Sequence, residues 1–398
     1  MTNNKKEVPC VSVIITVKNS DKTLMECVDS LLNQTLQNIE MVFVDGHSTD
    51  HTIDILKMLQ KKDDRIKIYT QDRPGIGAAK NYGIEHATGE YIAFLDSDDL
   101  FIDENALEIM YNAAKENNVK ICGAFRQIKP VYGDIYKHPL HRAFLVGFPK
   151  GRMFNYLDVQ YDYHFHNYIY NRKMIMDCNA RFAEIRVYDD TRFTIKAFEK
   201  AKTFFVVPVE LYLYRCHKAY DWNTDLCADA IKSLEEQLKY TSEHKLDMCH
   251  YFAFQRMSYE YGRLFEKRIK EGNFELLKLL IDAQEYINQD MIKKFVDNRI
   301  DPNITGPMDF PDNDIRFVGE DEKVIFAPIY NMISDKVETK VVNIDYDYYN
   351  TLENVYNSKT FKTGDFILKV PRKIYHIFKK IGDLLWKIKT YMMKNFMK

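Results

Sequence analysis

The first hundred residues alternate between short apolar runs and longer amphipathic stretches, and this alternation restricts the fold more than any other feature. Between the runs, apolar side chains such as Leu24, Val28 and Leu31 recur at helical spacing. Apolar strands that alternate with helices are typical of a mostly parallel sheet with helices on both faces. We therefore predict an α/β fold for the N-terminal part. The predicted strands are residues 11–15, 39–44, 66–69 and 91–95.

Polar loops follow three of these four predicted strands. They comprise residues 18–19 after the first strand, 45–50 after the second and 96–99 after the fourth. In sheets of this kind ligands bind beyond the carboxyl ends of the strands. We therefore expect the three loops to converge on one crevice.

The loop after the fourth strand is an acidic run, Asp96-Ser97-Asp98-Asp99. Carboxylates held this close repel one another unless a cation or hydrogen-bond donors lie between them. Oxygen ligands favour Mg²⁺ or Mn²⁺, and a cation that bridges a diphosphate needs only one or two protein carboxylates. The alternative is that these residues cap the helix predicted to begin near Glu104.

Charge and cysteine usage exclude several classes of protein. The chain has 56 Lys and Arg against 58 Asp and Glu, a formal net charge of -2, so no nucleic-acid partner is expected. Its seven cysteines are odd in number, lie far apart and form no CxxC pair, which indicates neither a disulfide framework nor a zinc site. Residues 1–7 are polar and no stretch approaches the ~20 apolar residues that span a bilayer. We expect a cytoplasmic protein that is not integral to the membrane.

Four motifs carry a resemblance to a known family. They are residues 11–19 (VSVIITVKN), 44–50 (VDGHSTD), 79–84 (AKNYGI) and 89–99 (GEYIAFLDSDD). In order and spacing they resemble the signature of family 2 inverting glycosyltransferases, which have the Rossmann-like GT-A fold. The resemblance is dense over residues 10–125, thinner to about residue 217, and does not cover the C-terminal part. It implies a nucleotide-sugar donor and a Mn²⁺ or Mg²⁺ cofactor.

The resemblance also implies roles for individual residues. Asp45 matches the residue that hydrogen-bonds a uracil ring, although a plain turn residue is the alternative. Many relatives have a second Asp followed by Gly where this chain has Gly46-His47, which leaves the base open. Asp96 matches the carboxylate that meets the ribose or donor sugar, and Asp98 the metal ligand. The implied donor-binding residues are Thr16, Val17, Asp45, Lys80, Asn81, Asp96, Ser97 and Arg215, and the implied metal ligands are Asp98 and His217.

Two further segments extend this set. Residues 212–217 (YLYRCH) resemble the family segment that closes the donor site, so Arg215 or His217 would neutralise the leaving diphosphate, with a structural role for His217 as the alternative. Asp189 and Asp190 resemble an acidic pair at the head of a helix. Inverting transfer needs one carboxylate to take the proton from the acceptor hydroxyl. We assign that role to Asp190, with Asp189 orienting it; the alternative is an N-cap for the next helix.

The stretch between Phe125 and Tyr170 shows the weakest resemblance and is predicted to include the acceptor region. Its aromatic and imidazole side chains would stack on sugars or pack in the core, two interpretations that the sequence leaves open. They are Tyr161, Tyr163, His164, His166 and Tyr168.

The remainder of the chain changes character. We predict a GT-A domain over residues 1–222, a mainly helical domain over 223–365, and a basic amphipathic helix over 366–398. That last helix pairs an apolar stripe with nine basic residues and one acid, Asp383, which is typical of binding at a membrane surface. Packing on the protein or a partner is the alternative.

These observations together predict transfer of a sugar from a nucleotide-diphosphate donor, with a UDP-sugar expected, to a hydroxyl of a glycan or lipid-linked acceptor in cell-surface polysaccharide synthesis. The enzyme would lie on the inner face of the membrane, and its oligomeric state is left open. One rival is a catalytically idle nucleotide-sugar-binding module. Another is a sugar-phosphate nucleotidyltransferase, which would need a Gly-rich basic loop that residues 16–20 do not provide. Gly75-Ile76-Gly77 is not a dinucleotide motif, because its sixth position is Lys80 and it does not follow the first strand.

Overall fold

The computed structural model describes residues 7–129, 136–137, 149–160, 162–215, 222–296, 314–318, 323–333 and 339–343. The chain divides into two compact units, and all of these residues belong to the first, which comprises residues 1–300 and 308–344. Tyr161, His217 and the predicted terminal helix at 366–398 lie outside the described residues. Within the described part of the chain, no helix is both long and apolar enough to cross a membrane.

The predicted alternation of strands and helices is confirmed. Every residue of the second strand is buried, which explains its continuous apolar sequence. The first helix buries Leu24, Cys27 and Val28 on the face that the helical spacing indicated. The elements are β1 (Val11–Val17), α1 (Leu24–Leu32), β2 (Ile39–Asp45), α2 (Thr52–Gln60), β3 (Ile66–Thr70), α3 (Ile76–His86) and β4 (Tyr91–Asp96).

The central sheet has ten strands in the order β3-β2-β1-β4-β9-β6-β10-β5, with β7 beside β6 and β8 beside β10. The pairings among β1 to β4 and between β6 and β10 are parallel, as predicted. Shorter strands add antiparallel pairs, above all β9 between β4 and β6. The added strands are β5 (Leu100–Phe101), β6 (Ile121–Lys129), β7 (Tyr136–Lys137), β8 (Arg152–Asn155), β9 (Tyr168–Asn171) and β10 (Thr203–Arg215).

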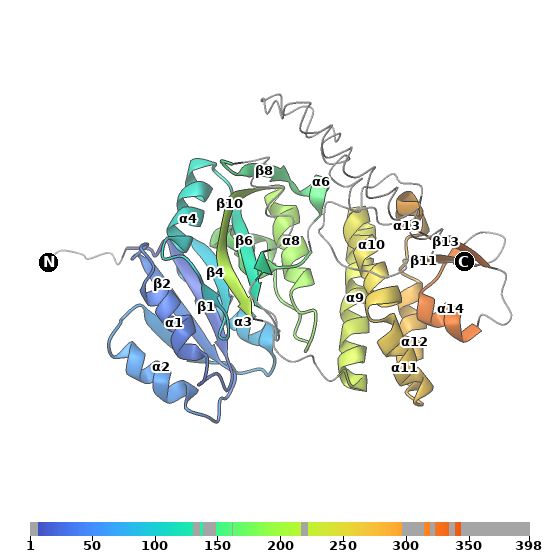
Figure 1. Ribbon diagram of the computed structural model, residues 1–398, viewed down its shortest axis with the longest axis horizontal. Helices are drawn as coiled ribbons and strands as arrows, with labels where there is room; N and C mark the ends of the chain where they lie inside the picture. The colour runs from blue at the N-terminus through green and yellow to red at the C-terminus, as the bar shows by residue number, and fades with distance from the viewer. Residues whose placement is uncertain are drawn as a thin grey trace, which may run out of the picture. The chain divides into compact units, whose positions relative to one another are not determined.

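The remaining helices of this part pack around the sheet (Figure 1), and the second acidic pair directly precedes α8. Phe94 of β4 lies 5.3 Å from Phe193 between ring centroids, and Phe193 stacks on Phe182 at 4.3 Å. This aromatic cluster packs the beginning of α8 onto the sheet. The helices are α4 (Ala106–Glu116), α6 (Tyr156–Val159), the 3₁₀ turn η1 (Phe165–Asn167), α7 (Arg172–Cys178) and α8 (Thr191–Ala201).

The strand register brings the predicted loops together. Thr16 of β1 lies opposite Val44 on one side and Asp96 on the other. The Asn19 amide donates to Ser48 Oγ at 2.9 Å, and the Ser20 and Ser97 hydroxyls are 2.8 Å apart. The predicted convergence of the three loops at one edge of the sheet is therefore confirmed.

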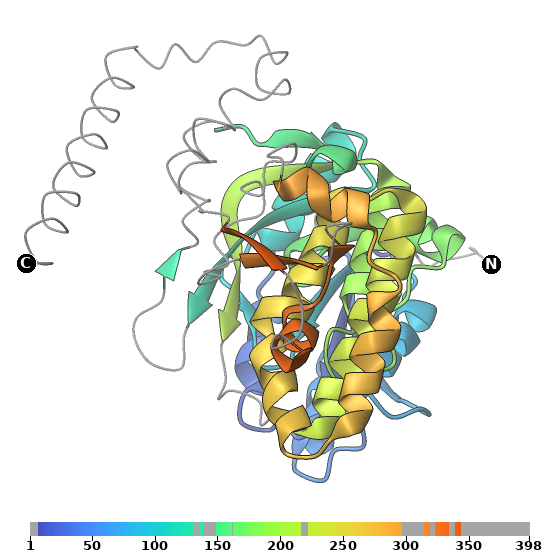
Figure 2. The same cartoon turned by 90° about the vertical axis from the view of Figure 1, so that its right-hand side faces the viewer.

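Helices dominate the region after residue 222, and α9 lies beside α8 (Figures 1 and 2). This region, predicted to be mainly helical, also contains a π-helical turn at Arg256–Glu260 and a small sheet with the order β12-β11-β13. The helices are α9 (Thr224–His244), α10 (Asp247–Gln255), the π-turn η2 (Arg256–Glu260), α11 (Gly262–Lys270), α12 (Phe274–Gln284), α13 (Gln289–Val296) and α14 (Ala327–Ile333). The strands are β11 (Asp314–Val318), β12 (Lys323–Val324) and β13 (Thr339–Asn343).

Candidate active site

The acidic run forms a tight turn at the end of β4. The Asp99 amide donates to the Asp96 carbonyl at 3.0 Å, and the Thr23 hydroxyl donates to the Ser97 carbonyl at 3.0 Å. Burial raises the pKa of Asp96, and neighbouring Lys80 opposes this shift. The run therefore concentrates negative charge at the edge of the sheet where the three loops meet.

Asp99 anchors this turn to β10. It is 1% exposed, and it accepts hydrogen bonds from Tyr212 Oη and from the Arg215 amide, each at 2.7 Å. Burial, with repulsion from Asp96, raises the pKa of Asp99 to about 8. Asp99 cannot be distinguished from its acidic neighbours by sequence alone, because its anchoring role depends on contacts with the distant strand β10.

Arg215 lies against the acidic run. Its Nε donates to the Asp98 carbonyl, and its Nη1 lies 2.5 Å from Glu26 Oε2. Its Nη2 is buried without a partner in the described part of the chain. A guanidinium in this position adds positive charge beside the carboxylates.

Asp45 lies at the end of β2 and is 4% exposed. Its carboxylate accepts from the His47 amide at 3.1 Å and the Ser48 amide at 3.2 Å. His47 has a positive φ of 61°, which the turn requires. Asp45 thus has the turn role that was the alternative interpretation, and its carboxylate has enough lone pairs to bind a ring N–H as well, as predicted for the donor base.

Lys80 joins the strand ends to the second acidic pair. Its Nζ is 3.0 Å from Asp189 Oδ2, and it lies 4.3 Å from the centre of the Phe165 ring. Burial alone would lower the pKa of Lys80, but Asp189, Asp96 and Asp190 outweigh this and raise it. The cation therefore stays charged between the two acidic segments.

Asn81, the next residue of α3, contacts the protein backbone. Its Nδ2 donates to the Phe182 carbonyl at 2.9 Å, and its Oδ1 accepts from the Phe182 amide at 2.8 Å. Gly77 allows the same close approach, because a Cβ there would lie 2.0 Å from the Ala183 carbonyl oxygen. The structure thus shows Asn81, predicted to bind the donor, holding the segment that leads to Asp189.

Asp190 precedes α8, but its side chain makes no capping hydrogen bond to that helix. The alternative interpretation as a side-chain N-cap is therefore not observed. Burial and repulsion from Asp189 raise the pKa of Asp190 to about 7, Asp162 adds to the shift, and Lys80 and Arg256 oppose it. A carboxyl with this pKa can accept a proton near neutral pH.

A buried ion pair beside Asp190 was missed by the sequence analysis. Arg256 and Asp162 are 3% and 0% exposed, and their two contacts are 2.6 Å (Nη1–Oδ2) and 3.0 Å (Nη2–Oδ1). Gln237 Nε2 also donates to Asp162, at 2.7 Å. One signal was available: Arg256 follows an apolar stretch, residues 251–254, and a buried arginine needs an acidic partner.

Some of the histidine and tyrosine side chains predicted for the acceptor region are buried in the core. His166 is 7% exposed, accepts from Arg126 Nη1 at 2.9 Å and stacks on Tyr212 at 4.6 Å. Burial lowers the pKa of His166 well below its usual range, so it is neutral. His164 Nε2 lies 2.5 Å from Arg126 Nη2, and Tyr168 is buried. For His166 and Tyr168 the structure therefore favours packing over direct stacking on a sugar.

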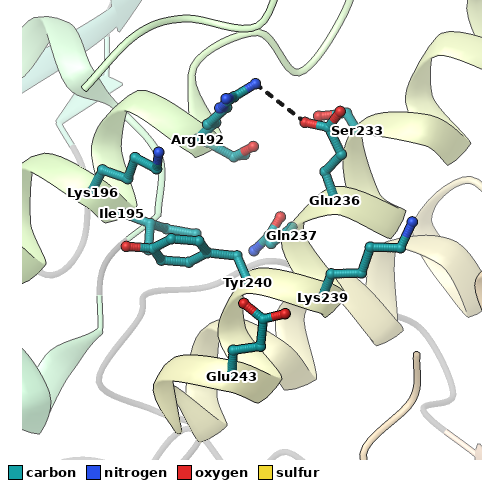
Figure 3. Close-up of a pocket in the computed structure, with 10 residues that line it drawn as sticks. Arg192, Ile195, Lys196, Ser233, Glu236, Gln237, Lys239, Tyr240 and Glu243 are labelled. Atoms are coloured by element: carbon teal, nitrogen blue, oxygen red, sulfur yellow. Dashed lines mark ion pairs between the residues drawn. The ribbon is translucent and has the colours of Figure 1, made fainter. Parts of the chain in front are cut away.

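A groove of about 250 Å³ lies between α8 and α9 (Figure 3). Arg192 and Glu236 approach each other across it at 3.5 Å. Its lining includes Thr191, the residue after Asp190, but no residue of the acidic run. We therefore do not identify the groove with the donor site.

The remaining predicted residues lie at the same edge of the sheet. Val17 is buried opposite Asp45, and Thr16 is half-buried opposite Asp96. Among the residues that the structure describes, no three His, Cys, Asp or Glu side chains gather as a ready metal site.

Known proteins share the motifs and the fold. The family model described as "Glycosyl transferase family 2" matches residues 12–178. EpsH of Bacillus subtilis (strain 168), whose name assigns it to the glycosyltransferases, is 32% identical over 225 residues, which are 53% of this chain and 62% of EpsH. The poly(ribitol-phosphate) beta-glucosyltransferase of Bacillus spizizenii is 43% identical over 115 residues, 28% of this chain and 18% of that protein.

The fold has a counterpart of known structure. The crystal structure of S. aureus TarS residues 1–349 in complex with UDP-GlcNAc has a TM-score of 0.59 at 22% identity, covering 71% of this chain and 82% of that one. This likeness shows the GT-A fold. The chain spans 62% and 61% of the lengths of EpsH and EpsJ, two curated relatives from Bacillus subtilis. Residues 12–178 are a glycosyl transferase family 2 domain, and the described α/β part of the chain has the GT-A fold.

Proposed function

We propose that this chain is an inverting glycosyltransferase that moves a sugar from a nucleoside diphosphate, with UDP the first choice, to a hydroxyl of a glycan or lipid-linked acceptor. One observation carries the proposal above all. The 3.0 Å Lys80–Asp189 pair ties the second acidic segment to the strand ends, beside Asp96. The family 2 domain supports transfer as the reaction, and UDP-GlcNAc in TarS supports a UDP-sugar as donor.

The chemistry follows from the carboxyl groups on either side of Lys80. Asp190 takes the proton from the acceptor hydroxyl as that oxygen bonds to the anomeric carbon. The bond from this carbon to the diphosphate oxygen breaks on the opposite face, so the configuration inverts. A pKa of about 7 leaves enough Asp190 ionised near neutral pH to accept the proton. Asp189, paired with Lys80, orients the acidic segment.

The residues present suit a divalent cation. Asp98 would supply an oxygen ligand. Burial is the main reason that the pKa values of Asp96 and Asp99 are raised, and repulsion from Asp98 adds to both shifts, so a cation there would relieve that repulsion. Mn²⁺ or Mg²⁺ held there would stabilise the charge that develops on the departing diphosphate. Arg215, which contacts the Asp98 carbonyl, adds a second positive charge. His217 remains a proposed ligand outside the described residues.

The acceptor and the cellular setting are extensions of the same proposal. The relatives include a poly(ribitol-phosphate) beta-glucosyltransferase, which supports an acceptor in cell-surface polymer synthesis. The basic segment 366–398 would bind anionic lipid at the inner face of the membrane and place the site beside lipid-linked acceptors.

Release of nucleoside diphosphate tests this function. The full chain is incubated with UDP-glucose, UDP-N-acetylglucosamine or GDP-mannose, with Mn²⁺ or with EDTA, and water serves as the acceptor of the sugar. We expect release from a UDP-sugar only with Mn²⁺. The Asp190→Asn variant should release no nucleotide but should bind UDP as tightly as the wild type does. The Asp98→Asn variant should instead show weaker Mn²⁺-dependent binding of UDP.

The same assay separates the rivals. Nucleotide binding without release from any of these donors would support an idle binding module. Formation of pyrophosphate from UTP and a sugar 1-phosphate would support a nucleotidyltransferase. Release by Asp190→Asn at the wild-type rate would show that another residue is the base.

A further inference from the structure

Tyr188, which directly precedes the acidic pair, has an unusual backbone conformation. Its φ is 58°, in the left-handed region. A bulky residue with a side chain avoids this region because its Cβ crowds the backbone. Such strain persists only where the surroundings hold it, and it is common at functional sites.

Two elements beyond the family 2 domain hold Tyr188 in place. Ser233 of α9 donates its hydroxyl to the Tyr188 carbonyl at 2.8 Å. Tyr188 Oη donates to Glu260 Oε1 at 3.1 Å, and the Tyr261 ring meets the Tyr188 ring edge-on at 5.3 Å. The Arg256 guanidinium lies 5.7 Å from the centre of the same ring. The backbone and side chain of Tyr188 are therefore fixed from two directions.

The π-helical turn explains how one short segment makes these contacts. In η2 the Tyr261 amide donates to the Arg256 carbonyl at 3.0 Å, which is the five-residue spacing of a π-helix. Arg256 at its start pairs with Asp162 beside Asp190, while Glu260 at its end accepts from Tyr188. π-Turns of this kind are frequent at functional sites.

Asp189 and Asp190, the two residues after Tyr188, are held by hydrogen bonds to neighbouring segments. The Asp189 carbonyl accepts from the Ala183 amide at 2.8 Å, and the Asp189 carboxylate accepts a hydrogen bond from Lys80 Nζ. The Asp190 carbonyl accepts from the Thr194 amide at 2.9 Å. A change in the Tyr188 backbone would therefore move both carboxyl groups.

We propose that Tyr188 is a positioning residue for sugar transfer: α9 and η2 hold it in a left-handed conformation that directs Asp189 toward Lys80 and fixes Asp190. The proposal rests on the proposed function for its kinetic consequence. It makes the helices after residue 222 part of the catalytic unit, although the family 2 domain ends at residue 178.

Tyr188→Phe tests this with a minimal change, because it removes only the hydroxyl that reaches Glu260. Tyr240→Phe is the matched control, since Tyr240 Oη of α9 donates to Glu199 of α8. With UDP-N-acetylglucosamine and Mn²⁺, we expect Tyr188→Phe to lower kcat for UDP release by about ten-fold with KM for the donor unchanged. Ser233→Ala should have the same effect, and Tyr240→Phe should have none.

A second measurement needs no activity. Hydrogen exchange of the full chain should show that peptides spanning residues 182–195 exchange about ten-fold faster in Tyr188→Phe than in Tyr240→Phe. Unchanged exchange there, unchanged kcat in an active enzyme, or equal effects of the two variants would overturn the proposal. Failure of the proposed function would show differently, as a wild-type chain that releases no nucleotide, and exchange alone would then decide on Tyr188.

Discussion

Replacing Asp190 by Asn should make the protein more stable and inactive. The substitution keeps the size of the side chain but removes its charge. Burial and repulsion from Asp189 raise the pKa of Asp190 from 3.8 to about 7, so the native state resists ionisation of this carboxyl. Asn carries no charge and avoids that cost, whereas the base needed for transfer is lost.

The sign and size of this effect follow from proton linkage. Because the folded pKa lies above the unfolded one, ionisation disfavours the folded state, with no cost below pH ~4 and a cost that grows until pH ~7. At about 1.4 kcal/mol per pKa unit, the full shift corresponds to a ceiling of about 4 kcal/mol. Asp190 is only half-buried, so we expect Asp190→Asn to raise the free energy of unfolding by about 2–4 kcal/mol at pH 8.

Urea denaturation at pH 5 and pH 8 measures this directly. At pH 5 the gain should fall to about 1 kcal/mol, because Asp190 is then protonated in the native state. Asp189→Asn is the contrasting control: it leaves the buried Lys80 without its 3.0 Å partner and should destabilise by about 1–3 kcal/mol. A pH-independent gain, or an Asp190→Asn variant less stable than the wild type at pH 8, would refute the reasoning.

Three further predictions use the same contacts. The rate of UDP release should rise with pH and level off above about pH 7, since the base must be ionised; a steady-state pH profile that is flat from pH 5 to 8 would contradict this. Gly77→Ala should destabilise by about 2 kcal/mol or more in thermal unfolding, because its Cβ would lie 2.0 Å from the Ala183 carbonyl oxygen, and a stable, active variant would contradict the packing of α3. Arg256→Met should cost about 3–5 kcal/mol in urea unfolding, because it leaves the buried Asp162 without a cationic partner, and adding Asp162→Leu should restore most of this loss. Equal losses in the single and double variants would argue against the ion pair.

The strands and helices of the first hundred residues could be predicted because their hydrophobic pattern repeats strongly. β2 is buried along its whole length, and α1 shows a clear apolar face. β9 has only four residues, too few to reveal a period, and its place between β4 and β6 depends on pairings distant in sequence. The π-helical turn η2 could not be predicted either, because the hydrophobic pattern of the sequence does not distinguish it from an α-helix.

The candidate site was predictable at the level of motifs and not of contacts. The acidic run and its neighbouring loops meet because parallel strands end at the same edge. By contrast, Lys80 and Asp189 are separated by 109 positions, and their pairing depends on α3 packing against residues 182–183. Whether Asp190 caps α8 also depends on a side-chain orientation that sequence spacing does not determine.

A crystal structure of the full chain with UDP and Mn²⁺ tests the central claim most directly, that the carboxyl ends of β1, β2 and β4 hold the donor. We predict density for the cation at Asp98, the diphosphate beside Arg215 and the uracil ring beside Asp45. Well-ordered UDP bound elsewhere on the protein, with no cation at Asp98, would contradict the account.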